Sequence, residues 1–228
     1  MKTNLNGVEV TRFDSYDEIT QKVFGLKKIF IAINPEKIYR PDEWLKALVK
    51  NNIGYVDGVG VLFGLWKKGV FQRRRLPGFK LWLKVIEKKP KAGYFLLGGT
   101  EDVINKTVLK LEKEFKDINI TGYRSGYFSD DEINQIISQL KKSKSRVIFV
   151  AMGSPKQEKI MKILHESYPA SYIGLGGSFD YYIEKVKTTP EWIQKIGFQW
   201  IHRSIHEPKR FKRQKIFFSY MINLIFKY

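Results

Sequence analysis

Short apolar runs rich in β-branched residues alternate with longer stretches of helical periodicity along most of this chain. The runs expected to form strands are 28–33, 54–56, 94–97, 118–122, 146–151 and 171–174. The stretches expected to form helices are 15–26, 41–50, 78–88, 101–115, 130–142, 155–167 and 190–206. Strands and helices in alternation predict an α/β fold with a mostly parallel sheet and helices on both of its faces.

The last 38 residues differ in composition from the rest of the chain. Residues 191–228 hold eight lysines and arginines, two acidic residues and nine aromatic residues, for a net charge of +6. We therefore predict a Rossmann-like domain over 1–190 and a basic, aromatic, helical appendage over 191–228. Basic residues beside aromatic ones suit the interfacial plane of an anionic bilayer. The alternative is that these aromatic side chains pack on the main domain as an ordinary C-terminal helix.

The net charge of +18 indicates an anionic partner: nucleic acid, anionic lipid or a phosphorylated substrate. A nucleic-acid-binding protein is one hypothesis, but no helix-turn-helix, RNA-recognition or zinc-finger signature is visible, so no nucleic-acid partner is expected. The chain has no cysteine, which excludes disulfides and fits a reducing compartment. The first seven residues lack the apolar segment of a signal peptide, and no apolar run approaches the roughly 20 residues that span a bilayer. We expect a cytoplasmic protein.

A polar segment, Gly153-Ser154-Pro155-Lys156-Gln157-Glu158, follows the apolar run 147–151. As a local structure, it predicts a helix start with Ser154 at the N-cap, Pro155 at the first helical position and Gln157 closing a capping box. As a binding site, the same geometry presents helix-start amides, Lys156 and Gln157 to a phosphate or a sugar. The spacing favours neither interpretation.

A second segment, Gly174-Leu175-Gly176-Gly177-Ser178-Phe179-Asp180, follows the last predicted strand. Its glycines are compatible with a simple turn. The segment lacks the glycine spacing of dinucleotide-binding folds and the lysine of the P-loop, which argues against NAD and ATP. Asp180 is expected either to cap a helix or to accept a hydrogen bond from a base or a ribose.

Asp57 stands where a predicted strand ends, beside Gly58 and Gly60. A carboxylate in this position is a candidate general base, although Asp-Gly pairs also form ordinary turns. His202 and His206 are one helical turn apart but lack the glutamate of zinc-protease motifs, so no metal site is expected. The chain contains no Asp-x-Asp pair of the kind that holds a divalent cation beside a diphosphate. Arginines or helix N-termini would then have to meet that charge, and no cofactor is expected.

Taken together, these segments resemble the WecG/TagA/CpsF glycosyltransferases of bacterial surface-polysaccharide synthesis over essentially the whole chain. Besides the segments above, the resemblance rests on Asn34-Pro35-Glu36, Asp57-Gly58-Val59-Gly60-Val61, Arg75-Leu76-Pro77-Gly78, Leu97-Gly98-Gly99, Gly126-Tyr127-Phe128, Gln199-Trp200-Ile201-His202-Arg203 and Glu207-Pro208-Lys209-Arg210. It implies metal-independent, inverting transfer of a sugar, such as an N-acetylhexosamine or its uronate, from a UDP-sugar. The implied acceptor is an undecaprenyl-diphosphate-linked sugar at the inner face of the cell membrane.

The resemblance also implies roles for individual residues. Asp57 would deprotonate the acceptor hydroxyl, with Arg75 and Gln157 as further catalytic residues. The substrate-binding residues would be Asn34, Tyr127, Lys156, Asp180, Arg203, Arg210 and Arg213. Among these, Tyr127 would stack on uracil, and the three C-terminal arginines would close over the diphosphate, whose oxygens match the guanidinium fork.

Three positions depart from the family pattern. Ala32 replaces a threonine, Lys80 replaces an aspartate, and Glu184 stands in place of a glycine, followed by Thr188-Thr189-Pro190 where Arg-Ala-Pro is usual. These departures concern donor or acceptor identity and leave open a family member with lost or altered transfer. A homo-oligomer is also compatible with the sequence.

Overall fold

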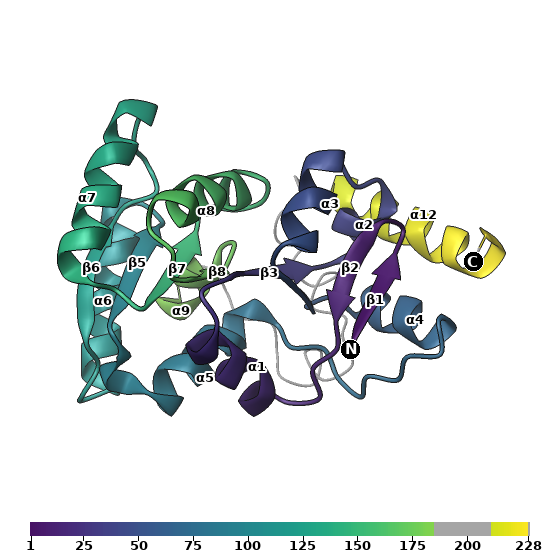
Figure 1. Cartoon of the computed structure of the whole chain (residues 1–228), viewed down its shortest axis with the longest axis horizontal. Helices are drawn as coiled ribbons and strands as arrows, with labels where there is room; N and C mark the ends of the chain where they lie inside the picture. The colour runs from purple at the N-terminus through teal and green to yellow at the C-terminus, as the bar shows by residue number, and fades with distance from the viewer. Residues whose placement is uncertain (185–210, 228) are drawn as a thin grey trace. The chain divides into compact units, whose positions relative to one another are not determined.

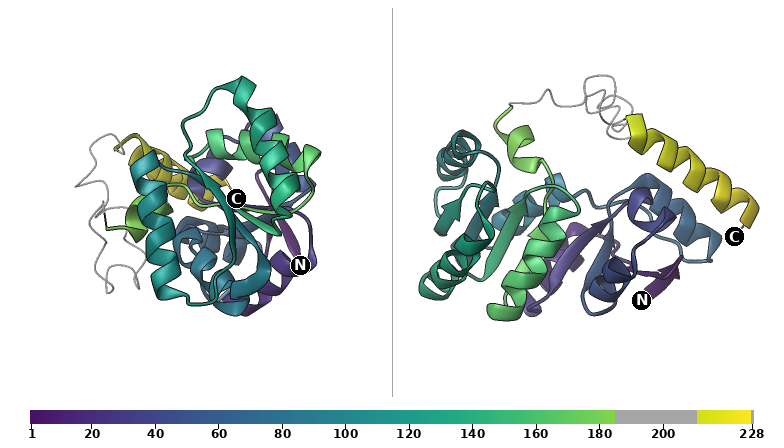
Figure 2. Two further views of the ribbon diagram at one scale, coloured as in Figure 1. Left: turned by 90° about the vertical axis from the view of Figure 1, so that its left-hand side faces the viewer. Right: turned by 90° about the horizontal axis from the view of Figure 1, so that it is seen from above.

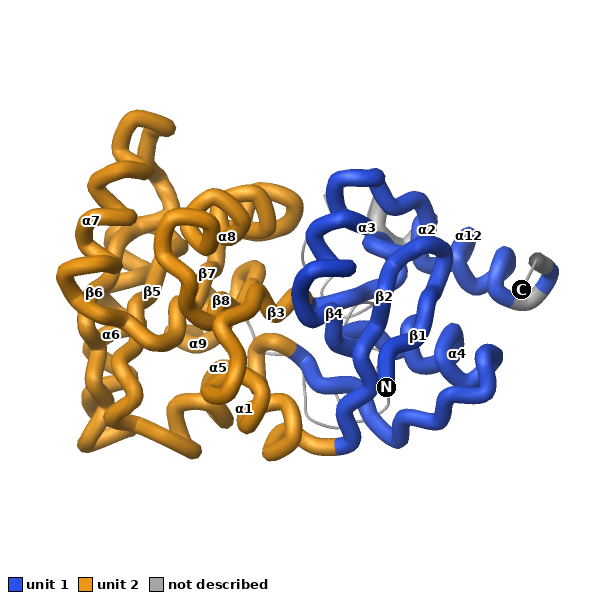
Figure 3. The backbone as a smooth tube through the Cα atoms, in the orientation of Figure 1, with its two compact units in different colours: residues 1–14, 32–77, 187–228 blue, residues 15–31, 78–186 orange. Residues whose placement is uncertain are grey.

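The computed structural model describes residues 1–184 and 211–227 (Figures 1 and 2). Its strands follow the hydrogen-bonded order β1-β2-β4-β3-β8-β7-β5-β6 in a mostly parallel sheet, which confirms the predicted Rossmann-like α/β class. The chain divides into two compact units (Figure 3). Unit 1 contains residues 1–14, 32–77 and the described part of 187–228, and unit 2 contains 15–31 and 78–186. The predicted division into 1–190 and 191–228 stays a prediction.

The strands of unit 2 end at a common edge. They are β5 (Tyr94–Gly98), β6 (Ile120–Arg124), β7 (Val147–Ala151) and β8 (Ser171–Gly174), with the first residues of β3 (Ile29–Ile33) beside β8. Their pairing is parallel, and it sets Gly98 opposite Ala151 and Val150 opposite Gly174. Because parallel strands point the same way, the loops that follow them emerge side by side.

Helices cover both faces of the unit 2 sheet (Figure 1). One group of helices packs together on one face: α1 (Tyr16–Gly25), α5 (Gly78–Lys88), α6 (Glu101–Glu114) and α9 (Ser178–Tyr182). On the other face lie α7 (Ile133–Ser143) and α8 (Lys156–Ser167), with the short 3-10 turns Pro90–Ala92 and Asp130–Glu132 in the connections. Trp82 is fully buried, with its ring 5.7 Å from that of Phe149 and 5.5 Å from that of Phe179. This aromatic contact joins α5, β7 and α9.

Unit 1 begins with a hairpin that the strand prediction missed. Its strands β1 (Lys2–Leu5) and β2 (Val8–Thr11) pair in antiparallel fashion around Asn6 and Gly7. Both turn residues have positive φ, 52° and 84°, which matches the two-residue turn that Asn-Gly favours in hairpins. β2 then pairs in parallel with β4 (Ile53–Val56). The signal was therefore present in the sequence, in the Asn-Gly pair.

The helices of unit 1 are α2 (Pro35–Tyr39), α3 (Glu43–Lys50), α4 (Val59–Lys67) and α12 (Phe211–Lys227). α12 packs on α2 and α4, and the right-hand view of Figure 2 shows it lying along them. Two glycines of α4 allow this approach. A Cβ added at Gly60 would lie 3.3 Å from the Phe217 ring, and a Cβ added at Gly64 would lie 2.5 Å from the Tyr220 hydroxyl. Small residues one turn apart let two helices come close together.

Replacing Gly64 by valine is expected to release α12 from α4. The new side chain would occupy the position of the buried Tyr220 hydroxyl, and overpacking of this kind costs about 1–3 kcal/mol. Limited trypsin digestion should then cleave beside Lys215 at least ~fivefold faster. The control is Gly25→Val, because an added Cβ at Gly25 has nothing within 4 Å. Equal cleavage in both variants would contradict the packing argument.

Most predicted elements are confirmed with small shifts of their ends. The helix predicted at 78–88 and the strand predicted at 171–174 have the predicted bounds, whereas the strand predicted at 118–122 lies two residues later as β6. α2 and α4 were not predicted, because short segments with glycine or proline read as loops. α9 was expected only as a helix near Asp180, without bounds. The helix predicted at 190–206 lies outside the described residues. Among the described helices, none is long and apolar enough to cross a bilayer.

Candidate active site

Asp57 and Asn34 lie side by side in unit 1, at the ends of adjacent strands; together with Arg75 and Lys37 we call them the Asp57 group. The amides of Asp57 and Gly58 both donate to the carbonyl of Ile33, at 3.0 and 3.2 Å. Asn34 is the next residue and caps α2, its side-chain oxygen accepting from an amide one turn later at 3.2 Å. An added Cβ at Gly58 would lie 2.8 Å from Pro35 Cδ, so glycine is needed for this close approach.

Arg75 is held next to the same strand end. The amide of Leu76 donates to the carbonyl of Val56 at 2.7 Å, which places Arg75 beside the residue that precedes Asp57. Arg75, Asp57 and Asn34 are all half-buried. The backbone of unit 1 thus brings three of the predicted site residues, with a carboxylate, an amide and a guanidinium, to neighbouring strand ends.

Lys37 is a member of the Asp57 group that the sequence did not reveal. It is 7% exposed, and its ammonium donates to the carbonyl of Ala32 at 2.8 Å. Burying a cation costs free energy unless the cation is hydrogen-bonded or paired. The hydrogen bond to the Ala32 carbonyl offsets part of this cost and keeps Lys37 beside Asn34 at the end of β3. In the sequence, Lys37 stands between Glu36 and Ile38 and looks like an ordinary surface lysine.

Gln157 joins two strand-end loops of unit 2; with Lys156, Tyr127 and Asp180 we call it the Gln157 group. Its side chain is 3% exposed, accepts from the amide of Gly176 at 2.8 Å and donates to the Glu158 carboxylate at 3.0 Å. An added Cβ at Gly174 would lie 2.7 Å from its amide nitrogen. Glu158, 1% exposed, is a second residue to which the sequence gave no role.

The predicted capping box at the start of α8 is wrong. The helix begins at Lys156, its N-cap position is Pro155, and no side chain caps it. The Gln157 side chain instead reaches Gly176, because the sheet register brings the loop after β8 beside the loop after β7. The prediction that this segment follows a strand is confirmed, whereas the hydrogen bonds predicted within the segment are wrong.

Lys156, the first residue of α8, lies next to the loop after β6 that carries Tyr127. The Lys156 ammonium donates to the Gly126 carbonyl at 3.1 Å and lies 5.5 Å from the centre of the Phe128 ring. The Gly126 amide in turn donates to Gly99 at 2.9 Å. These contacts fix the loop after β6, whereas the Tyr127 ring is 77% exposed.

Two glycines at the end of β5 give these loops room. Gly98 has φ 140°, and an added Cβ would lie 2.2 Å from the Ala151 carbonyl oxygen, so only glycine fits there. The Gly99 amide donates to the same carbonyl at 3.1 Å. The loops that follow β5, β6, β7 and β8 are therefore connected through backbone hydrogen bonds and the Gln157 and Lys156 side chains.

A charged pair lies just beyond the Tyr127 loop. Glu132 accepts from the Ser129 amide at 2.9 Å and from its hydroxyl at 3.0 Å, and it pairs with Arg124 at the end of β6. The hydrogen bonds from Ser129, followed by the charge of Arg124, hold the pKa of Glu132 below its ordinary value. Glu132 is therefore ionised at neutral pH and keeps the Arg124 guanidinium paired.

Asp180 lies in the first turn of α9 and is half-buried. The expectation that it caps this helix is wrong, since the N-cap position is Gly177. Its carboxylate makes no hydrogen bond within the part of the chain that the structure describes, and its expected role in binding a base or a ribose stays a prediction. Two positions later, burial and a hydrogen bond to Glu114 raise the pKa of Tyr182.

Several predicted residues cannot be placed. Arg203, Arg210, His202 and His206 lie outside the described residues, and so does the side chain of Arg213. Over residues 1–184 and the described side chains of α12, no three histidine, aspartate or glutamate side chains gather as metal ligands do.

The structure shows the settings of Ala32, Lys80 and Glu184, whereas Thr188-Thr189-Pro190 lies outside the described residues. Ala32 offers its carbonyl to Lys37, and Lys80 is exposed with its ammonium 5.6 Å from the Phe79 ring centre. Glu184 has φ 61°, a left-handed conformation that glycine adopts more easily, and it pairs with Lys110 at 3.4 Å.

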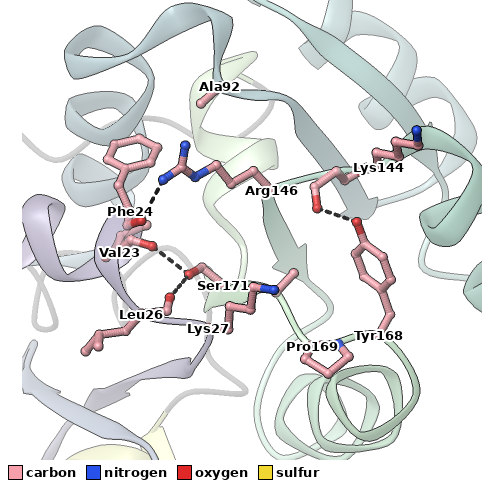
Figure 4. A pocket seen from close by; sticks show the side chains of 13 residues that line it. Val23, Phe24, Leu26, Lys27, Ala92, Lys144, Arg146, Tyr168, Pro169 and Ser171 are labelled. Atoms are coloured by element: carbon pink, nitrogen blue, oxygen red, sulfur yellow. Dashed lines mark hydrogen bonds between the residues drawn. The ribbon is translucent and has the colours of Figure 1, made fainter.

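An open groove of about 650 Å³ lies elsewhere in unit 2 (Figure 4). It is lined by residues at the amino ends of β7 and β8 and by the end of α1, the opposite edge from the Gln157 group. Its polar groups bond to one another: Arg146 donates to the Phe24 carbonyl at 2.8 Å, and Tyr168 donates to the Ser145 carbonyl at 2.8 Å. No predicted site residue lines this groove.

The fold and its loops define a class of protein: a Rossmann-like α/β protein whose polar side chains gather where parallel strands end. Within that class the assignment is specific. The sequence model of the glycosyl transferase WecG/TagA/CpsF family matches residues 3–228, nearly the whole chain, and the chain belongs to this family. The protein is thus a member of a family of glycosyltransferases.

Proposed function

We propose that this protein transfers a sugar from a UDP-sugar to an undecaprenyl-diphosphate-linked sugar, without a metal ion and with inversion at the anomeric carbon. The observation that carries the proposal is the Asp57 group, whose carboxylate, amide and guanidinium residues are brought to neighbouring strand ends by backbone hydrogen bonds in a glycosyltransferase-family chain. The site of action would be the inner face of the cell membrane.

In this mechanism, Asp57 removes the proton from the acceptor hydroxyl. The acceptor oxygen forms a bond to the anomeric carbon as the bond from that carbon to the UDP oxygen breaks, and the electron pair leaves with UDP. A single base suffices because the diphosphate is already a good leaving group. Arg75, with the C-terminal arginines, would neutralise the charge that develops on the diphosphate.

The Gln157 group would bind the nucleotide. Gln157 holds the loops after β7 and β8 in one arrangement, so its role would be to position the loop amides rather than to react. The exposed Tyr127 ring suits stacking on uracil, and the half-buried Asp180 carboxylate suits a hydrogen bond to the base or the ribose.

UDP is expected to raise the melting temperature of the protein in the presence of EDTA. At about 100 times its Kd, a ligand stabilises the folded state by about 2.7 kcal/mol, which corresponds to about 5–10 °C for a chain of this size. Differential scanning fluorimetry with UDP, ADP and a random oligonucleotide measures this effect. A shift that requires Mg²⁺, or salt-sensitive oligonucleotide binding without a response to UDP, would contradict the proposal.

The donor sugar follows from a direct screen. The protein is incubated with a UDP-sugar and a polyprenyl-diphosphate-linked sugar acceptor, and mass spectrometry detects the product. The UDP-linked N-acetylhexosamines and their uronates are tested first. Each donor is tested in a separate reaction, so the donor that gives product identifies the sugar, and the mass increase confirms the composition of the transferred residue. Any product shows that the chain is an active family member.

A further inference from the structure

Three large aromatic side chains form an exposed cluster in unit 1, at the end of α4 and in the loop after it. Phe63, Trp66 and Phe71 are 38%, 39% and 64% exposed. The Trp66 ring lies 5.3 Å from the Phe63 ring in an edge-on contact and 5.9 Å from the Phe71 ring in a stacked contact. Contiguous exposed aromatic side chains mark interaction sites more often than single exposed ones do. We call these three residues the aromatic cluster.

Hydrogen bonds of the buried residue Gln72 hold the loop that carries Phe71. Gln72 is fully buried; its side chain accepts from the Phe13 amide at 3.2 Å and donates to the Arg74 carbonyl at 2.7 Å. The Trp66 indole donates to the Gln72 carbonyl at 3.0 Å. The hydrogen bonds that fix this loop therefore leave Phe71 on the outside.

α12 adds a second exposed apolar stripe to unit 1. Phe218, Ile222 and Phe226 follow each other at intervals of four and are 56%, 56% and 81% exposed. Tyr220 and Leu224, on the side that packs on the rest of unit 1, are buried. α12 thus has an apolar side against the protein and another toward solvent.

The contacts between α4 and α12 show that the helices run in the same direction. Three contacts follow in the same order along both: Gly60 with Phe217, Gly64 with Tyr220, and the Lys67 ammonium with the Leu224 carbonyl. Each residue turns an α-helix by about 100°, and the contact positions of the two helices face each other. In parallel helices, the residue before a contact position on α4 and the residue after a contact position on α12 therefore lie on the same side of the helix pair.

The aromatic cluster and the start of the stripe meet this condition. Phe63 and Trp66 each precede a contact position of α4, and Phe218 follows a contact position of α12. They therefore lie on the same side of the helix pair, while the later residues of the stripe turn toward the outer side of α12. By this geometry Phe218 extends the side of the helix pair that carries Phe63 and Trp66.

The charged residues in the two segments that carry the aromatic cluster and the stripe are all lysines and arginines. Between Asp57 and Glu87 the chain has seven lysines and arginines and no acidic residue, and α12 has four lysines and arginines and no acidic residue. Arg73 and Arg74, next to Phe71, are exposed. Exposed aromatic rings flanked by cations match the interface of an anionic bilayer, where rings enter the headgroup level and cations meet the lipid phosphates.

We propose that the aromatic cluster and the exposed stripe of α12 together form a surface that docks on an anionic lipid bilayer. Membrane binding is then a property of α4 and its loop as well as of residues 191–228. The inference rests on the proposed function, because a lipid-linked acceptor requires the enzyme to reach the membrane. Docking through α4 would also hold Asp57, two residues before this helix, at a defined distance from the lipid surface.

The test compares two matched double variants in vesicle flotation, with phosphatidylglycerol–phosphatidylcholine vesicles and the full chain. Phe63→Ser/Phe71→Ser removes two side chains of the cluster, whereas Leu109→Ser/Ile163→Ser removes two apolar side chains of unit 2 with nearly the same exposure, 67% and 40%. We expect the first to lower the vesicle partition coefficient by about tenfold or more and the second to leave it unchanged. Phe71→Ser alone should give an intermediate loss, and circular dichroism checks that each variant is folded.

A second pair tests the charges. Arg73→Gln/Arg74→Gln should weaken binding to anionic vesicles but not to neutral ones, and the exposed α7 pair Lys141→Gln/Lys142→Gln should do so by less. Equal binding of Phe63→Ser/Phe71→Ser and the wild type would overturn the proposal. So would light scattering that shows the cluster variant dissociating an oligomer while its vesicle binding stays intact, since a second copy of the chain would then be the occupant.

Transfer to a short-chain, water-soluble acceptor separates this inference from the proposed function. If the cluster variant loses vesicle binding but keeps this transfer, both proposals hold. If the wild type binds vesicles through the cluster but transfers no sugar, the proposed function fails and the docking surface stands.

Discussion

Replacing Asp57 by asparagine is expected to lower the rate of sugar transfer by about 10²–10⁴-fold, the usual contribution of a general base, while leaving UDP affinity unchanged. Asparagine keeps the size of the side chain, and the backbone hydrogen bonds that place residue 57 beside Asn34 do not involve that side chain. The acceptor hydroxyl would then have no base to take its proton. Single-turnover kinetics by mass spectrometry give the rate, and calorimetry without metal gives the UDP affinity.

Asp42→Asn is the matched control for this variant. Asp42 is an exposed carboxylate of the same unit, at the N-cap position of α3, where its side chain makes no capping hydrogen bond. Its replacement should leave transfer unchanged. A turnover rate for Asp57→Asn within twofold of the wild type, or a parallel loss of UDP binding, would remove Asp57 from the role of base.

The second large effect is expected from Gln157→Ala. The truncation removes a side chain that bonds to both the half-buried Gly176 amide and the buried Glu158 carboxylate. A lost hydrogen bond costs about 0.5–1.5 kcal/mol, and about 1.5–3 kcal/mol when one partner is charged, so the melting temperature should fall by about 5–10 °C. The loops after β7 and β8 would also lose the connection that fixes their amides, and UDP affinity should fall with stability.

Two comparisons identify the cause of that loss. Gln135→Ala, an exposed glutamine on α7, should leave stability and UDP binding unchanged. Gln157→Glu should be at least as damaging as Gln157→Ala, because it would place a second carboxylate within 3.0 Å of Glu158 in a buried position. Unaltered UDP binding by a folded Gln157→Ala protein would show that the loops do not need this connection.

The elements predicted from the sequence are those whose signal is local. The helix at 78–88 and the strand at 171–174 follow from periodicity within a single window, and both were predicted with their observed bounds. The hairpin around Asn6 and Gly7 also had a local signal, the Asn-Gly pair, that went unused. α4 had none, because its glycines, which serve helix packing, weaken the helical pattern.

The sequence by itself determined the alternation of strands and helices, the positions of the polar segments at strand ends, and the family to which they belong. These features depend on neighbours within a few residues, or on the order of short segments along the chain. Only the tertiary structure decided that Gln157 bonds to Gly176, that Lys37 is buried beside Asn34, and that the α4 glycines receive α12. Each of these contacts depends on the register of the sheet or on helix packing, which brings together groups that have no periodic relation in the sequence.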